Sequence, residues 1–195
     1  MNKTIDYYNR NAALFVSGTL HADISDCRNR FLHYVKPGGR LLDAGCGSGR
    51  DALAFVRAGY PVDAFDASEE LCRFASELLG FPVRCERFED LTGTSLYDGI
   101  WACASLLHVR GADLPDAVRR LKELLKPEGV LYASFKEGTS EREKDGRFFH
   151  DMTADSCRDL FRDAGLEVLE VFRSGDVREG RADETWVNII VKKRG

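Results

Sequence analysis

Leu41-Leu42-Asp43-Ala44-Gly45-Cys46-Gly47-Ser48-Gly49 is the stretch that decides the fold of this 195-residue chain. Residues 40–44 are short and apolar, as in a buried strand, and three alternating glycines follow them. Residues 50–58 then have a helical pattern that Gly59 ends. The sequence therefore predicts a strand, a glycine loop and a helix. Such a loop lets a ligand approach the backbone, and the helix start offers it free N–H groups.

The same unit recurs along the chain. Alternating apolar and helical patterns predict strands at 62–65, 83–85, 98–102, 130–135, 167–172 and 185–192 and helices at 24–35, 69–79, 114–125 and 154–164. The first five strands alternate mostly with helices, which predicts an α/β fold with a mostly parallel sheet covered on both faces. Only residues 173–184, without a helical pattern, join the last two strands, so these should pair antiparallel at one edge.

Composition excludes several classes of protein. Hydrophobic residues make up 44% and charged residues 31% of the chain, which suits one globular domain over residues 1–195. The net charge of −4 disfavours nucleic acid as a partner. Six scattered cysteines without a CxxC pair predict free thiols and no metal site, and the absence of a long apolar run predicts a cytoplasmic protein without a membrane segment.

Asp66 supports a nucleotide-like ligand for the glycine loop. It ends the second strand 21 positions after Gly45, close to the offset at which an acid receives ribose hydroxyls. Residues 47–52 also satisfy the G-x-G-x-x-A dinucleotide fingerprint, which leaves an NAD-dependent oxidoreductase as an alternative. The longer loop that begins at Gly45 and the short chain weigh against that alternative, because a dehydrogenase needs a second nucleotide half and a substrate domain.

Several motifs in order resemble the class I S-adenosylmethionine-dependent methyltransferases. Residues 41–49 resemble the first motif of that family and residues 62–68 the second. Residues 88–91 resemble its adenine-side loop, residues 97–108 its fourth-strand motif, and residues 124–131 the turn into its fifth strand. The resemblance implies a three-layer Rossmann-like fold, with a seven-stranded, mostly parallel sheet whose last strand is antiparallel.

The resemblance also implies a seat for S-adenosylmethionine. Gly45 and Gly47 would lie against its methionine part, Asp43 would orient its amino group, and Asp66 would take its ribose hydroxyls. Phe88 would border the adenine; Arg87 stands where the family usually has an adenine-binding Asp, so Glu89 or backbone groups would replace that contact. The remaining expected neighbours of the cofactor are Cys46, Gly49, Ala67 and Cys103, of which the two cysteines are interpreted as small packing residues.

The methyl acceptor is expected to be a small molecule. Residues 47–51 and 101–108 are most similar to small tellurite-resistance methyltransferases, which suggests a tellurite- or selenite-like oxyanion, although a thiol or another metabolite fits equally. A module that binds S-adenosylmethionine without turnover is a further alternative. Residues 1–36 are expected to form a helical segment that covers the cofactor, with Tyr7 and Tyr8 either in a lid or in a packed helix.

Two residues are candidates for catalysis. His108 follows the fourth strand, where it could act as a general base, and a locally hydrogen-bonded histidine is the alternative. Arg147 lies in the polar segment 136–151, which should hang over the methyl group as a mobile lid. A guanidinium there could orient an anionic acceptor through forked hydrogen bonds, whereas a solvated loop arginine is the simpler interpretation.

Overall fold

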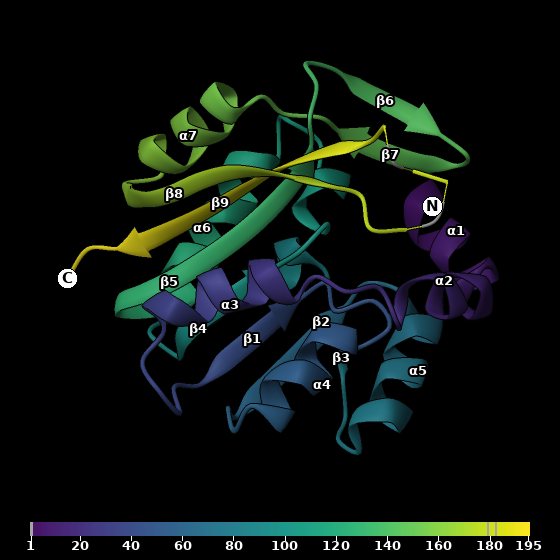
Figure 1. Cartoon of the computed structure of the whole chain (residues 1–195), viewed down its shortest axis with the longest axis horizontal. Coiled ribbons are helices and arrows are strands. Elements are labelled where there is room, and N and C mark those ends of the chain that lie inside the picture. The colour runs from purple at the N-terminus through teal and green to yellow at the C-terminus, as the bar shows by residue number, and fades with distance from the viewer. Residues whose placement is uncertain (1, 179, 182) are drawn as a thin grey trace.

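A computed structural model describes residues 2–178, 180–181 and 183–195 (Figure 1). Its helices are α1 (Lys3–Arg10), α2 (Ala12–Thr19), α3 (Ser25–Tyr34), α4 (Arg50–Arg57), α5 (Glu69–Leu79), α6 (Leu114–Leu124) and α7 (Ala154–Asp163), with single 3₁₀ turns η1 (Phe88–Asp90) and η2 (Leu106–His108). Its strands are β1 (Leu41–Ala44), β2 (Val62–Asp66), β3 (Arg84–Cys85), β4 (Tyr97–Ala102), β5 (Leu125–Lys136), β6 (Glu141–Lys144), β7 (Arg147–His150), β8 (Leu166–Gly175) and β9 (Thr185–Lys193).

Seven of these strands form one sheet in the order β3-β2-β1-β4-β5-β9-β8. The pairs among the first five strands are parallel, and β9 is antiparallel to both of its neighbours. The predicted α/β fold, with its seven-stranded sheet and antiparallel last strand, is confirmed. The order reverses between β1 and β4, which creates a crevice at the carboxyl ends of these two strands.

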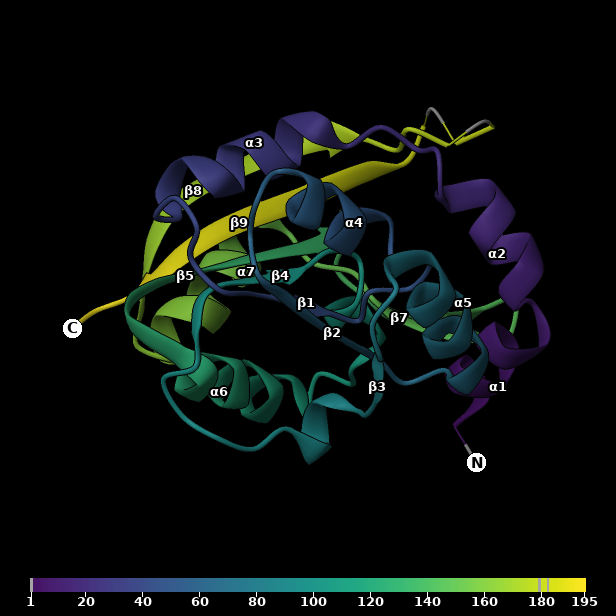
Figure 2. The same ribbon diagram turned by 90° about the horizontal axis from the view of Figure 1, so that it is seen from below.

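Helices cover both faces of the sheet and give it three layers (Figure 2). On one face, Phe31 of α3 and Phe55 of α4 pack on Leu41 and Trp101. On the other face, α6 and α7 bury their apolar sides against alternate residues of the same strands, such as Leu42. Since both faces are covered, β1 is buried at every position, as the continuous apolar run predicts.

Local signals set the ends of the elements. The Ser68 hydroxyl accepts a hydrogen bond from the Leu71 N–H (3.3 Å) and caps α5, and Gly80 ends that helix with φ of 75°. Two predictions for the strands need correction. β5 begins at Leu125, five residues earlier than predicted, because Leu125 pairs with Tyr97 across an irregularity in the ladder.

The segment after β5 also differs from the prediction. Residues 141–150 form a two-stranded antiparallel hairpin and not an irregular mobile loop. Asp145 and Gly146 both have positive φ (52° and 78°), as a two-residue type I′ hairpin turn requires. The Asp-Gly dipeptide is therefore the signal that shapes this segment.

The N-terminal residues are helical, as expected. α1 and α2 lie at the end of the sheet where the crevice opens (Figure 2), whereas α3 packs on a sheet face. Tyr8 belongs to α1, where its ring packs edge-on against Phe15 of α2 (5.1 Å between ring centroids). No helix among the described residues is both long and apolar enough to span a bilayer.

Candidate active site

The glycine loop 45–49 forms the floor of the crevice. The N–H groups of Gly45 and Cys46 both donate to the Phe65 carbonyl at 2.9 Å, which ties the loop to the end of β2. Gly45 has φ of 79°, and a Cβ there would lie 2.5 Å from Cβ of Ser105. The Ser105 hydroxyl in turn donates to the Ala44 carbonyl (2.7 Å). Glycine is thus required at position 45 by its left-handed backbone and by packing against the residues that follow β4.

A cavity of about 770 Å³ opens above this loop. Its size lies within the range of small-molecule sites. The wall combines the ends of β1, β2 and β4 with η2, α1, the hairpin β6–β7 and residues 174–178. Eleven of the twelve residues that the sequence predicts for the site border this cavity. The twelfth, Gly49, is the N-cap residue of α4.

Asp66 points toward the loop at the end of β2. Its two carboxylate oxygens accept the N–H groups of Gly47 (2.8 Å) and Ser68 (2.9 Å). Burial raises the pKa of Asp66, and these N–H groups offset part of the effect. The carboxylate is thus fixed in direction at the cavity wall, next to Ala67.

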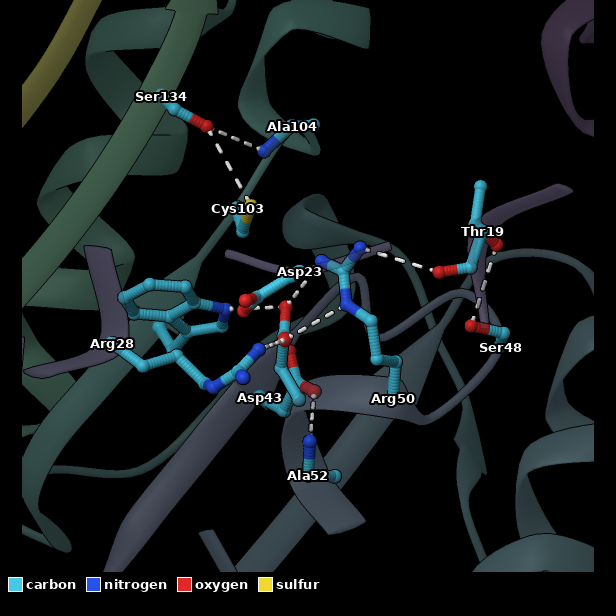
Figure 3. Close-up of polar contacts among 12 residues, drawn as sticks. Thr19, Asp23, Arg28, Asp43, Ser48, Arg50, Ala52, Cys103, Ala104 and Ser134 are labelled. Atoms are coloured by element: carbon cyan, nitrogen blue, oxygen red, sulfur yellow. Dashed lines mark hydrogen bonds and ion pairs between the residues drawn. The ribbon is translucent and has the colours of Figure 1, made fainter. Parts of the chain in front are cut away.

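A buried ionic network lies beneath the loop (Figure 3). Asp51 accepts hydrogen bonds from Arg28 (2.8 Å), from Arg50 (2.9 and 2.8 Å) and from the Trp101 indole (3.0 Å). Burial alone would raise the pKa of Asp51, but the two guanidinium groups hold it below its usual value. The sequence analysis missed this network, because nothing in the spacing of these residues links Arg28 to Asp51.

Asp43 borders the cavity and lies next to that network (Figure 3). It is 2% exposed, and its Oδ2 accepts the Ala52 N–H at 3.0 Å. Burial, and after it the charge of Asp51, raises the pKa of Asp43 well above its usual value. A cationic ligand group beside Asp43 would relieve both effects, and an ammonium group is such a group.

Phe88 and Glu89 of η1 border the cavity where the adenine is expected. The Phe88 ring packs edge-on against Phe65, with 5.4 Å between centroids. Glu89 is exposed and forms an ion pair with Arg87 (3.1 Å). Both residues of that pair border the cavity. Although Arg87 replaces the usual Asp of the family, the Glu89 carboxylate thus lies close to that position.

Two of the cysteines that border the cavity, Cys46 and Cys103, are the ones predicted to contact the cofactor. Burial raises the pKa of Cys103 to about 12 and that of Cys46 well above its usual value. Both therefore remain thiols at neutral pH and are poor nucleophiles. The Ser134 hydroxyl, which donates toward the Cys103 sulfur at 3.8 Å, also accepts the Ala104 N–H (Figure 3).

His108 closes the opposite side of the cavity. Its Nδ1 lies 2.6 Å from the Phe148 carbonyl and its Nε2 lies 3.0 Å from the Tyr8 hydroxyl. A carbonyl can only accept, so Nδ1 carries the proton and Nε2 accepts from Tyr8. Burial lowers the pKa of His108 to about 4, so the ring is neutral at pH 7. Both ring nitrogens are thus engaged, which favours the locally bonded alternative over a free general base.

Arg147 is buried and not solvated. Its side chain is 9% exposed and lies between the rings of Tyr7 (4.4 Å from Cζ to the centroid) and Phe149 (5.2 Å). The nearest carboxylate oxygen belongs to Asp145, 3.6 Å from Nη2 on a side chain that is 62% exposed. Nε has no hydrogen-bond partner among the described residues.

A second charged cluster at the cavity was missed by the sequence analysis. Lys136, at the end of β5, forms ion pairs with Glu184 and Asp176, and its Nζ lies 4.8 Å from the centre of the Trp186 ring. Arg178 also binds Asp176. A buried lysine at the end of a central strand was the signal available, but the acids that pair with it follow 40 or more positions later.

Comparison with known proteins identifies the family. A family model described as "Methyltransferase domain" matches residues 16–171. Malonyl-[acyl-carrier protein] O-methyltransferase of Erwinia pyrifoliae is 34% identical over 61% of this chain and 47% of its own length. Ubiquinone biosynthesis O-methyltransferase of Xanthomonas campestris pv. campestris is 33% identical over 50% of this chain and 43% of its own length. The chain thus spans a little under half the length of these two relatives.

Solved structures share the fold at low sequence identity. The 1,6-didemethyltoxoflavin-N1-methyltransferase of Burkholderia thailandensis, solved with S-adenosylhomocysteine, superposes with a TM-score of 0.80 at 20% identity, over 98% of this chain and 85% of that one. The ordered motifs, the sheet topology and the match to the family model agree. The chain belongs to the class I S-adenosylmethionine-dependent methyltransferase family.

Proposed function

We propose that this chain transfers the methyl group of S-adenosylmethionine to a small-molecule acceptor bound in the same cavity. One observation carries the proposal: Asp43, the glycine loop and Asp66 share a single cavity with Tyr8, His108 and Arg147. When bound, S-adenosylmethionine supplies an electrophilic methyl group. The protein then has to align the acceptor and exclude water.

The residues present fit this cofactor. Asp43 would hold the ammonium group, since it is a buried carboxyl at the cavity whose charged form an added cation would stabilise. Asp66 would accept the ribose hydroxyls through the lone pairs that Gly47 and Ser68 leave free. Phe88 would border the adenine, with Glu89 at its edge, while Cys46, Cys103, Gly49 and Ala67 shape the wall or the loop beneath it.

The acceptor side holds the two residues predicted to act in catalysis. Arg147 brings a buried positive charge to the cavity, which supports binding of an anion. His108 would hold the Tyr8 ring in place at the acceptor end of the cavity, because the Tyr8 hydroxyl donates to its Nε2. The tellurite-like acceptor suggested by residues 47–51 and 101–108 has no support beyond those motifs, and the two curated relatives named above are O-methyltransferases by name.

Calorimetric titration with S-adenosylmethionine and with NAD tests the cofactor. We expect binding of S-adenosylmethionine and none of NAD; the reverse result would reinstate the oxidoreductase alternative. Formation of S-adenosylhomocysteine in the presence of candidate acceptors then separates an enzyme from a binding module. Cofactor binding without turnover on any acceptor class would favour the module.

A further inference from the structure

The acceptor end of the cavity contains a buried cation without a buried counter-charge. Burying a charge costs several kcal/mol unless another charge or hydrogen bonds compensate for it. Around Arg147, compensation comes from two aromatic faces, from the neighbouring Tyr8 hydroxyl and from Asp145, which lies 3.6 Å away on an exposed side chain. An anionic ligand group would supply what the described residues do not.

Neighbouring cations differ from Arg147 in this respect. Arg178 binds Asp176 through two nitrogens, and Arg142 binds Asp151 at 2.5 and 3.1 Å. Lys136 is paired with Glu184. Arg110 also borders the cavity, but it is exposed to water, whereas Arg147 is buried with an exposed acid as its ion-pair partner. The planar fork of Arg147 suits a carboxylate.

Neither His108 nor Tyr8 at this end of the cavity is suited to act as a general base. Nδ1 of His108 donates its proton to the Phe148 carbonyl, and Nε2 accepts a hydrogen bond from the Tyr8 hydroxyl. Burial lowers the pKa of His108 to about 4, so its imidazole is far too weak a base to take the proton of an aliphatic hydroxyl. Burial also raises the pKa of Tyr8, so the phenol stays protonated. An acceptor oxygen that is already ionised needs no proton transfer to either of these groups.

A carboxylic acid meets both conditions, since its pKa of about 4 makes it an anion at neutral pH. Aromatic rings flank Arg147, and the cavity wall also includes Tyr8, Phe148 and Trp186. We propose that the acceptor is a small carboxylic acid with an apolar body, whose carboxylate binds Arg147 and receives the methyl group on oxygen. This proposal rests on the methyl transfer proposed above.

The step balances without a proton transfer. One carboxylate oxygen forms the bond to the methyl carbon while the sulfur–carbon bond breaks and its electron pair stays on sulfur. An anion and a sulfonium cation become a neutral ester and a neutral thioether. A water-excluded cavity favours this loss of charge, because separated charges are less stable there than in water.

Binding to the S-adenosylhomocysteine-loaded protein tests recognition without turnover. We expect phenylacetate to bind, and phenylacetamide and phenethylamine to bind at least tenfold more weakly. Arg147→Gln should weaken phenylacetate binding at least tenfold and leave S-adenosylhomocysteine binding unchanged. Arg158→Gln, which removes an equal charge from an ion pair on α7, is the matched control. Equal binding of the three probes, no binding of phenylacetate, or an unaffected Arg147 variant overturns the proposal.

Product chemistry tests the position of the methyl group. The protein is incubated with methyl-tritiated S-adenosylmethionine and phenylacetate, benzoate or hexanoate. Label that mild base releases as volatile methanol marks a methyl ester, which is the expected product. Base-stable label, or transfer to none of the three acids, overturns the proposal. If S-adenosylhomocysteine does not bind in the first experiment, the proposed function itself has failed, which distinguishes the two results.

Discussion

The Tyr8 hydroxyl donates a hydrogen bond to Nε2 of His108 at 3.0 Å, across 100 positions of sequence. The bond joins α1 to the end of η2 and fixes the imidazole as the Nδ1-protonated tautomer. Both side chains are half-buried and border the cavity.

Tyr8→Phe removes the donor and leaves Nε2 unsatisfied. We expect a loss of about 0.5–1.5 kcal/mol in the free energy of unfolding, measured in urea, because that is the usual net contribution of an intramolecular hydrogen bond. Tyr7→Phe is the matched control, since the Tyr7 hydroxyl has no hydrogen-bond partner among the described residues, and should change stability by less than about 0.5 kcal/mol. Equal effects of the two variants would show that the Tyr8–His108 bond contributes nothing.

His108 should make the protein sensitive to acid. Its pKa is about 4 in the fold against 6.5 when exposed, so between these values the unfolded chain binds more protons and stability falls as pH decreases. Between pH 7 and pH 5 this residue should cost about 2 kcal/mol. Urea unfolding at both pH values should show that loss reduced in His108→Gln, which does not titrate. An identical pH dependence in the variant would mean that the ring is not held neutral.

Asp66→Asn tests the ribose side of the cofactor seat. An amide can accept only one of the two N–H bonds, and it cannot offer a charged acceptor to ribose. We expect S-adenosylmethionine affinity, measured by calorimetry, to fall by about 1.5–3 kcal/mol. Asp63→Asn, on the same strand but paired with Arg40 and Tyr97, should retain the affinity. Comparable affinities for the two variants would remove Asp66 from the site.

Alanine substitutions at Gly45 and Gly59 distinguish the effect of close packing on stability from that of backbone strain. Both have φ near +80° (79° and 88°), but an added Cβ meets Ser105 at 2.5 Å only at position 45, and nothing within 4 Å at position 59. Gly59→Ala should cost about 1 kcal/mol of unfolding free energy for strain alone. Gly45→Ala should cost about 1–3 kcal/mol more because the loop or Ser105 must shift. Equal losses would contradict the tight contact between the loop and Ser105.

The local patterns of the sequence predicted the sheet and most of the elements. Residues 41–66 form the predicted strand, loop, helix and strand, because buried parallel strands and glycine-flanked helices leave strong signals over short ranges. The hairpin was missed, because β6 is exposed and carries no alternating apolar residues. Its Asp145-Gly146 turn was the available signal.

The candidate site was predicted in outline only. The cofactor residues stand next to the glycine loop or at strand ends, so their positions follow from topology. Contacts between distant segments do not follow from it. Tyr8 meets His108, and Arg147 is buried against Tyr7, only because α1 folds over the hairpin. The sequence therefore favoured an exposed Arg147, where the structure places a buried one.

The way α1 rests on the hairpin limits how such a protein can diversify. The Phe148 N–H donates to the Thr4 hydroxyl (3.0 Å), and Lys3 pairs with Glu143 (3.0 Å). If the hairpin were replaced by that of a relative and α1 were not, Thr4 and Tyr8 would lose partners that fit them. Residues 3–8 and 141–148, far apart in the sequence, must therefore change together when the acceptor changes, while residues 41–90 can stay constant.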